Sequence, residues 1–233
     1  MKDKEKNIAF FILISFSFLF FEIIYPLLGF NYNNFSPRTK LLLLILKYII
    51  FIVILFIRYR KYLIDKWKDF RKNLDNYSGT AFKWWALGFL LMMVVNQVLN
   101  RIVGGVGANE ETVQSLLDAE PIIAIMATTL FAPIVEELIY RKSLQDCFKN
   151  KTLYIIISGL IFGLIHVLGS SNPLDYLFII SYGLFGACFA KILSDTDNIY
   201  STIMVHMFHN GILSILAIVV KLLWYQDMKL IKK

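Results

Sequence analysis

The chain has 233 residues, of which 58% are hydrophobic, and its mean hydropathy of +0.62 lies above that of soluble domains. These values exclude an ordinary soluble enzyme and predict an all-α, polytopic membrane protein that forms a single domain over residues 1–233. The net charge of +7 does not indicate a nucleic-acid partner, because the lysines and arginines lie between the apolar runs, as on the cytoplasmic side of a membrane. The two cysteines, Cys147 and Cys188, do not resemble a disulfide framework or a metal-ligand cluster.

Seven apolar segments predict seven transmembrane helices, near residues 8–29, 40–58, 81–102, 121–141, 152–168, 174–193 and 199–222. The first is interpreted as a retained anchor, because it is longer than the apolar part of a signal peptide. The most basic loop, RYRKYLIDKWKDFRKN at 58–73, is predicted to be cytoplasmic, as is the N-terminus. Seven crossings place the C-terminal lysines outside, against the charge rule. Either the tail folds back, or the last segment splits near Gly211 and forms an eighth crossing.

Residues 136–141 read EELIYR and end an apolar span, where charged side chains are costly. Glu137 and Arg141 are four positions apart on a helix, with the acid on the N-terminal side, so they form a neutralising structural pair. Glu136 has no cationic neighbour in the sequence. Inside a membrane its carboxyl group must be protonated, hydrated or matched by a polar group from another helix.

The candidate partners of Glu136 are three histidines, His166, His206 and His209, which all fall in predicted membrane helices. If the helix of His166 forms an antiparallel hairpin with the helix of Glu136, both residues lie ~20–24 Å from the turn. They are then at the same depth in the membrane. His206 and Asn210 are four positions apart and share a helix face. His209 is rotated from His206 by about 60°, so it either flanks this face or points elsewhere.

Each of these residues also has a plainer interpretation, since a single histidine or asparagine often joins two membrane helices by a hydrogen bond. The functional interpretation rests on convergence, because an unpaired acid, two imidazoles and an amide are all costly in lipid. Glu22 and Lys47 lie near the middle of their spans, which allows them to pair with each other. Gly159 and Gly163, four residues apart, predict close packing of two helix backbones.

Three motifs on successive membrane helices carry a family resemblance. The chain resembles the CPBP intramembrane proteases, also called the Abi family, which include the CAAX prenyl endopeptidases of the Rce1 type. The family pattern is EExxxR, then FxxxH, then HxxxN or HxxxD. It corresponds here to EELIYR at 136–141, FGLIH at 162–166 and HMFHN at 206–210, within a similar region of residues 121–216.

The resemblance implies a role for each matched residue. Glu136 would be the catalytic glutamate, and His166 would help it to orient a water molecule. His206 and Asn210 would face the developing oxyanion. Glu137 would be the neighbour of the catalytic glutamate, held by Arg141 in a salt bridge.

The chemistry implied by the resemblance is hydrolysis of a peptide bond by water, with the buried Glu136 as general base and later as general acid. Donors from the third motif would stabilise the tetrahedral oxyanion. No cofactor is needed for this mechanism. A zinc variant stays open, because Glu136, His166 and His206 supply the two imidazoles and one carboxylate of some hydrolytic zinc sites. The lack of an H-E-x-x-H motif slightly favours the metal-free mechanism.

The resemblance also implies a substrate class, a membrane-associated or lipidated protein or peptide that enters from the bilayer or from the cytoplasmic side. The many Ile, Lys and Asn residues are typical of an AT-rich bacterial genome. We therefore expect a multi-pass protein of the bacterial plasma membrane, with a cytoplasmic N-terminus. A bacterial member would process an exported or bacteriocin-like peptide, or confer immunity to one, rather than cleave a prenylated protein.

Two functions of other classes stay open at this point. The first is a non-catalytic membrane regulator that binds a partner such as a sensor kinase. The second is a small transporter whose buried acid and histidines relay protons. The sequence shows no inverted repeat and no pair of broken helices, which counts mildly against the transporter.

Overall fold

The computed structural model describes residues 2–21, 27–31, 34–168 and 170–231. Within these ranges the chain is helical and contains no strand, which confirms the predicted all-α membrane bundle. The elements in chain order are α1 (Lys2–Leu19), α3 (Pro37–Lys72), α4 (Leu74–Val103), α5 (Ala108–Ala119), α6 (Pro121–Ile125), the π-helix η3 (Met126–Phe131), α7 (Ala132–Glu137), the π-helix η4 (Leu138–Ser143), α8 (Lys151–Ile165), the 3-10 helix η5 (Pro173–Leu177), α9 (Phe178–Thr196) and α10 (Ile199–Ile231).

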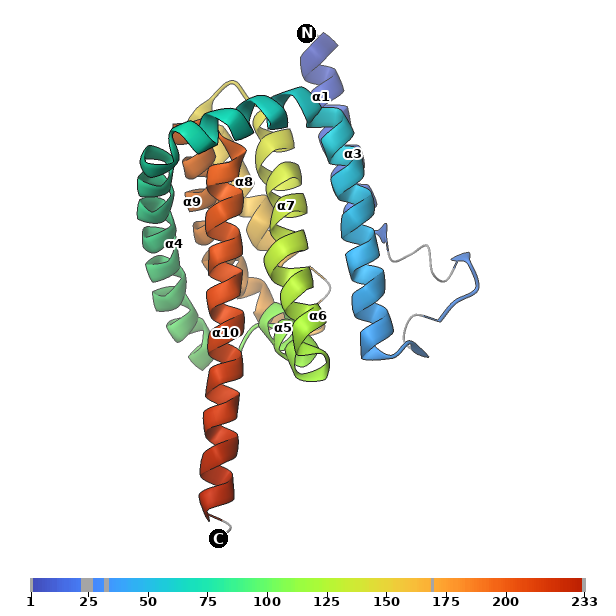
Figure 1. Ribbon diagram of the computed structural model, residues 1–233, viewed down its shortest axis with the longest axis vertical. Helices are drawn as coiled ribbons and strands as arrows, with labels where there is room; N and C mark the ends of the chain where they lie inside the picture. The colour runs from blue at the N-terminus through green and yellow to red at the C-terminus, as the bar shows by residue number, and fades with distance from the viewer. Residues whose placement is uncertain (1, 22–26, 32–33, 169, 232–233) are drawn as a thin grey trace.

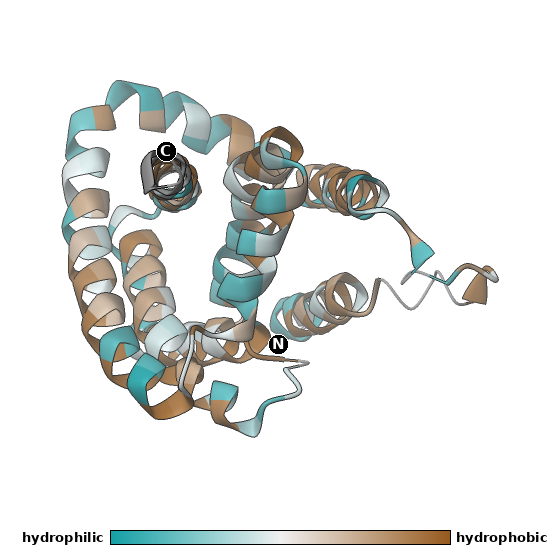
Figure 2. Ribbon diagram, turned by 90° about the horizontal axis from the view of Figure 1, so that it is seen from below, coloured by the Kyte–Doolittle hydropathy of each residue, from teal (hydrophilic) through white to brown (hydrophobic). Residues whose placement is uncertain are grey.

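Five helical runs in the described part of the chain are long and apolar enough to cross a bilayer: Pro37–Lys72, Leu74–Val103, Pro121–Ser143, Pro173–Thr196 and Ile199–Trp224. α1 and the 15-residue α8 lie at the two other predicted crossings. Figure 1 shows α1 starting at one end of the bundle and α10 ending at the other, as an odd number of crossings requires. Large apolar side chains such as Leu13 and Ile57 are exposed on the outer faces, where Figure 2 shows hydrophobic ribbon, as expected for helices in lipid.

The last helix corrects one prediction about the number of crossings. α10 is continuous through Gly211, so an eighth crossing formed by a split at this glycine is wrong. Among the described residues the helix also does not fold back, and it extends beyond the bundle in Figure 1. The glycine instead allows a close contact, because a Cβ added there would lie 3.3 Å from Cγ2 of Thr129 in η3.

The basic segment predicted as a loop at 58–73 is helical and forms the C-terminal part of α3. It is amphipathic, since Leu63 is buried while most of its lysines and arginines are exposed. Figure 1 shows this part of the chain crossing one end of the bundle. Two hydrogen bonds join this part of α3 to the start of α10. The Asn198 side chain donates to the Lys66 carbonyl (2.9 Å), and the Tyr200 hydroxyl donates to the Leu63 carbonyl (3.2 Å).

α1 packs beside α3 and η4 through aromatic contacts. The ring of Phe18 lies 5.1 Å from that of Phe51 and 6.5 Å from that of Tyr140. Lys47 is buried in the same region, with its Nζ atom 4.4 Å from the centre of the Phe18 ring. The pairing predicted between Lys47 and Glu22 stays a prediction, because Glu22 lies outside the described residues.

α8 and α9 approach each other closely at small residues. A Cβ added at Gly159 would lie 2.7 Å from the carbonyl oxygen of Gly183 and 2.9 Å from the Cβ of Ala187, and one added at Gly163 would collide with the carbonyl of Ile179. The packing predicted for the two glycines of α8 is therefore confirmed.

We predict that Gly159→Ala lowers the free energy of unfolding by about 1–3 kcal/mol, because the new methyl group collides with backbone that has no room to move. Thermal unfolding in detergent measures this effect as a lower midpoint. Gly79→Ala is the matched control, since a Cβ there meets nothing within 4 Å. Equal midpoints for both variants would contradict the tight α8–α9 contact.

Candidate active site

The glutamate pair lies at the end of α7, a short α-helical segment between two π-helical turns, η3 and η4. The segment predicted as one span at 121–141 is thus not one regular α-helix. Pro133 explains the first interruption, because it has no N–H group and its ring crowds the preceding turn. The N–H of Ala132 accordingly bonds to the carbonyl of Ala127, five residues back. Single π turns inside α-helices occur frequently at functional sites.

Glu137 is fully buried and is held from two sides. Its Oε1 atom accepts a hydrogen bond of 2.9 Å from His206 Nδ1, and its Oε2 atom lies 3.5 Å from Arg141 Nε. The side chains of both Glu137 and Arg141 have 0% exposure. A buried carboxylate needs this kind of compensation, so the contacts fix the position of the His206 ring as well as that of the acid.

Glu136 has a different environment from its neighbour. Its side chain is 17% exposed, and its Oε2 atom lies 3.9 Å from His206 Nε2, which is too long for a direct hydrogen bond. The two nitrogens of one imidazole therefore face the two adjacent glutamates, Nδ1 toward Glu137 and Nε2 toward Glu136. Glu136 is the acid of the pair that keeps capacity for another ligand.

Arg141 carries a buried positive charge with aromatic neighbours. The centre of its guanidinium group lies 4.2 Å from the ring of Phe162 and 5.9 Å from that of Phe189. Within the described residues none of its three side-chain nitrogens has a hydrogen-bond acceptor. Glu137 and the two ring faces thus supply the compensation that the structure records for this charge.

His166 directly follows α8 as its C-terminal cap, rather than lying inside a membrane helix as predicted. Its Nδ1 atom is 2.8 Å from the carbonyl of Phe162, and its ring stacks on Tyr182 at 4.8 Å. A carbonyl only accepts, so Nδ1 carries the hydrogen and Nε2 of the neutral ring is an acceptor. None of the hydrogen bonds recorded for the described residues joins His166 to Glu136. The Phe162 ring contacts both imidazoles, with ring distances of 4.2 Å to His166 and 6.2 Å to His206.

The side chains of Asn210 and His209 point from α10 in different directions. The Asn210 amide donates to the backbone carbonyl of Thr128 in η3 at 2.8 Å. His209 is buried against α4 and α9, where Nδ1 accepts from Trp85 Nε1 at 3.4 Å and the ring lies 4.4 Å from that of Phe185. Of the two orientations left open for His209, the structure shows the one that points away from the glutamates.

The residues considered for a zinc site are not gathered around one point. Over the described ranges no group of three His, Cys, Asp or Glu side chains is placed to hold a metal ion. The Nδ1 atom of His206 is bonded to Glu137 and that of His166 to a backbone carbonyl, which leaves the Nε2 atom of each ring available, as in histidines that bind a metal. The mechanism proposed below is built from the side chains of this chain.

Thr128 and Pro133 lie near the site and were not identified by sequence reasoning, and Phe162 was included only as the first residue of the FGLIH motif. Pro133 carried a usable signal, because a proline inside an apolar span predicts a break three residues before the first glutamate. The sequence contained no such signal for the aromatic contacts of Phe162 or for the carbonyl of Thr128 that accepts from Asn210, since both depend on neighbouring helices.

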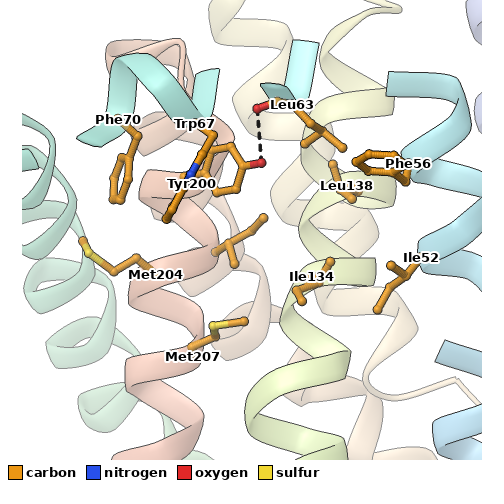
Figure 3. A pocket seen from close by; sticks show the side chains of 11 residues that line it. Ile52, Phe56, Leu63, Trp67, Phe70, Ile134, Leu138, Tyr200, Met204 and Met207 are labelled. Carbon is orange, nitrogen blue, oxygen red and sulfur yellow. Dashed lines mark hydrogen bonds between the residues drawn. The ribbon is translucent and has the colours of Figure 1, made fainter. Parts of the chain in front are cut away.

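An apolar pocket of about 610 Å³ lies beside the seam between α7 and α10. Figure 3 shows side chains from α3, α7, η4 and α10 around it. They are Ile52, Phe56, Leu63, Trp67, Phe70, Ile134, Leu138, Tyr200, Ile203, Met204 and Met207. Ile134 and Leu138 flank the glutamate pair in the sequence, and Met207 follows His206, so the pocket and the polar cluster share two helices.

Comparison with known proteins shows which family and relatives the region with the motifs is similar to. Residues 118–212 match the sequence profile of the family described as Type II CAAX prenyl endopeptidase Rce1-like. A Bacillus subtilis protein named "Putative membrane peptidase YdiL" is 26% identical over 156 residues, which are 64% of this chain and 61% of the relative. The "UPF0177 protein YvdC" of Lactococcus lactis subsp. lactis is 26% identical over 144 residues, 58% of this chain and 52% of the relative.

The chain thus covers less than two thirds of the length of these two relatives. No solved structure matches it. The region in common with the family profile contains EELIYR, FGLIH and HMFHN, the three motifs that carried the resemblance. Residues 118–212 of this integral membrane chain are thus similar to the Rce1-like family of CAAX prenyl endopeptidases.

Proposed function

We propose that the chain is an intramembrane endopeptidase that hydrolyses a peptide bond with a water molecule activated by Glu136. The observation that carries the proposal is the difference in contacts and exposure between two adjacent acids. Glu137 is held by a hydrogen bond from His206 and an ion pair with Arg141, while Glu136 is partly exposed and has an imidazole nitrogen 3.9 Å away. A water molecule fits between two such groups and can bond to both. Glu136 is then in position to take its proton.

The proposed reaction begins when water attacks the scissile carbonyl carbon and transfers a proton to Glu136. The carbonyl π electrons move to oxygen and form the tetrahedral oxyanion. The C–N bond then breaks, and Glu136 gives the proton to the leaving amine. The carboxyl group returns to its starting state, so no covalent intermediate with the enzyme forms.

The two histidines and the amide have separate roles in this proposal. His166 offers Nε2 as an acceptor, which suits orientation of the attacking water. His206 is proposed as a donor to the oxyanion through Nε2, since the bond between Nδ1 and Glu137 holds the ring with Nε2 toward Glu136. Asn210 uses one N–H on Thr128 and retains a second one for the same purpose.

The proposed substrate is a membrane-associated or lipidated protein or peptide. The apolar pocket supports this class, because eleven residues from α3, α7, η4 and α10 line it and it adjoins the helices that carry Glu136 and His206. An apolar group bound there would hold the adjacent peptide bond near the polar cluster. For a bacterial plasma-membrane protein with a cytoplasmic N-terminus, an exported or bacteriocin-like peptide, or self-immunity against one, fits this class.

We predict that Glu136→Gln lowers turnover of a cleaved peptide by about 10²–10⁴-fold, because glutamine cannot accept the proton. Cleavage by the purified protein in detergent is measured with and without a chelator, and the thermal midpoint is expected to stay unchanged. Glu111→Gln, at an exposed position in α5, is the control. Loss of wild-type activity with chelator would overturn the metal-free mechanism, and full activity of Glu136→Gln would favour a regulator that only binds a partner.

Substitution of the second glutamate, Glu137, is expected to lower stability. Glu137→Gln leaves the Arg141 charge buried without its acid, which costs about 3–5 kcal/mol of stability. The thermal midpoint therefore falls, and adding Arg141→Met should restore most of it because both charges are then absent. A double variant that unfolds as early as the single one would show that the ion pair is not the source of the stability.

The pocket is tested by filling it. Ile52→Trp places a larger side chain in the pocket from α3, so we expect KM to rise about tenfold for a lipidated or membrane-embedded substrate, with kcat retained. The same peptide without its apolar group should show no change. Ile156→Trp, at an outward position of α8 that is 52% exposed, is the matched control. Equal effects on both substrates would argue against the pocket as a substrate site.

A further inference from the structure

We infer that Asn210 is a positioning residue that replaces a backbone hydrogen bond removed by Pro133, and thereby sets the orientation of the helix that carries Glu136. The inference deepens the proposed function and rests on it for its catalytic consequence. Its structural part stands on the contacts between η3 and α10 alone. It gives the Asn210 amide a role in addition to the proposed donation of a hydrogen bond to the oxyanion.

The carbonyl of Thr128 lacks a donor from its own helix. In a regular α-helix it would accept from the N–H of Ala132, but that N–H bonds to Ala127. In a π turn it would accept from residue 133, which is proline and has no N–H. A carbonyl left unpaired in the interior of a membrane helix is costly, because lipid offers no donor.

Asn210 satisfies this carbonyl from the neighbouring helix. Its Nδ2 atom donates to Thr128 at 2.8 Å. The next residue on α10 is Gly211, and its missing side chain lets α10 approach η3, since a Cβ there would lie 3.3 Å from Thr129 Cγ2. The amide and the glycine together form a contact that fits the irregular backbone of η3.

The contact bears on the site because the two helical runs meet again one turn earlier on α10 and nine residues later on the run of η3 and α7. His206 lies four residues before Asn210 on α10, and Glu137 lies at the end of α7, which begins directly after η3. The Asn210–Thr128 and His206–Glu137 bonds therefore join the two helices at two points. Two points fix both the separation and the rotation of the helices, and with them the 3.9 Å between Glu136 and His206.

A double-substitution cycle tests the inference. Asn210→Leu removes the donor and is expected to lower the thermal midpoint by about 4–8 °C. Pro133→Ala restores an N–H within reach of Thr128, so in that background Asn210→Leu should lower the midpoint by less than half as much. Thiol-reactive dye reports unfolding in detergent, because both cysteines, Cys147 and Cys188, are free and buried.

Pro121→Ala is the control background. Pro121 stands at the first position of α6, where a helix has no backbone acceptor for its N–H, so Asn210→Leu should keep its full effect there. An equal midpoint loss in the Pro133→Ala background, or no loss from Asn210→Leu at all, would overturn the inference. Neither result depends on peptide cleavage, so failure here is distinguishable from failure of the proposed function.

Activity gives the second readout. Asn210→Leu should lower kcat by about 10²-fold with little change in KM, since a misoriented Glu136 binds substrate but reacts slowly. The loss should shrink in any Pro133→Ala protein that turns over. A kcat loss of the same size in both backgrounds would show that Asn210 acts on the reacting atoms directly and not through Thr128.

Discussion

The fully buried carboxylate of Glu137 is the constraint on which the site depends. With 0% exposure in a membrane-spanning helix, it must be matched by positive charge and hydrogen bonds, and Arg141 and His206 supply both. This requirement ties α10 to α7 and sets the His206 ring so that its second nitrogen faces Glu136. An acid that looks purely structural thus determines the environment of the acid that is proposed to react.

A second constraint comes from the backbone. Because lipid offers no hydrogen-bond partners, irregular helix within a membrane must be satisfied by other parts of the protein. Both π turns around α7 show this: Asn210 of α10 donates to the carbonyl of Thr128, and Ser158 of α8 donates to that of Tyr140 at 2.8 Å. The irregular segment that bears the glutamates is therefore braced from two different helices, one on each side.

Much of the fold was predictable from the sequence, and the misses share one origin. Apolar length and spacing located the helices, including the close contact at Gly159. The basic segment at 58–73 was predicted as a loop, because charge density suggests solvent, yet its buried apolar side chains make it an amphipathic end of α3. Gly211 was considered a break, yet it is a site of helix contact. In both cases the outcome depended on neighbouring helices, which a local pattern does not contain.

The sequence by itself determined the helical class, the order of the three motifs and the Glu137–Arg141 pairing, because lipid permits few backbone conformations and helical spacing places residues four apart together. Only the tertiary structure decided which groups meet between helices. It brought His206 rather than His166 against the glutamates, turned His209 toward Trp85 and directed Asn210 to a backbone carbonyl. Depth along a helix follows from counting residues, whereas rotation about the helix axis follows from how the side chains of adjacent helices interlock.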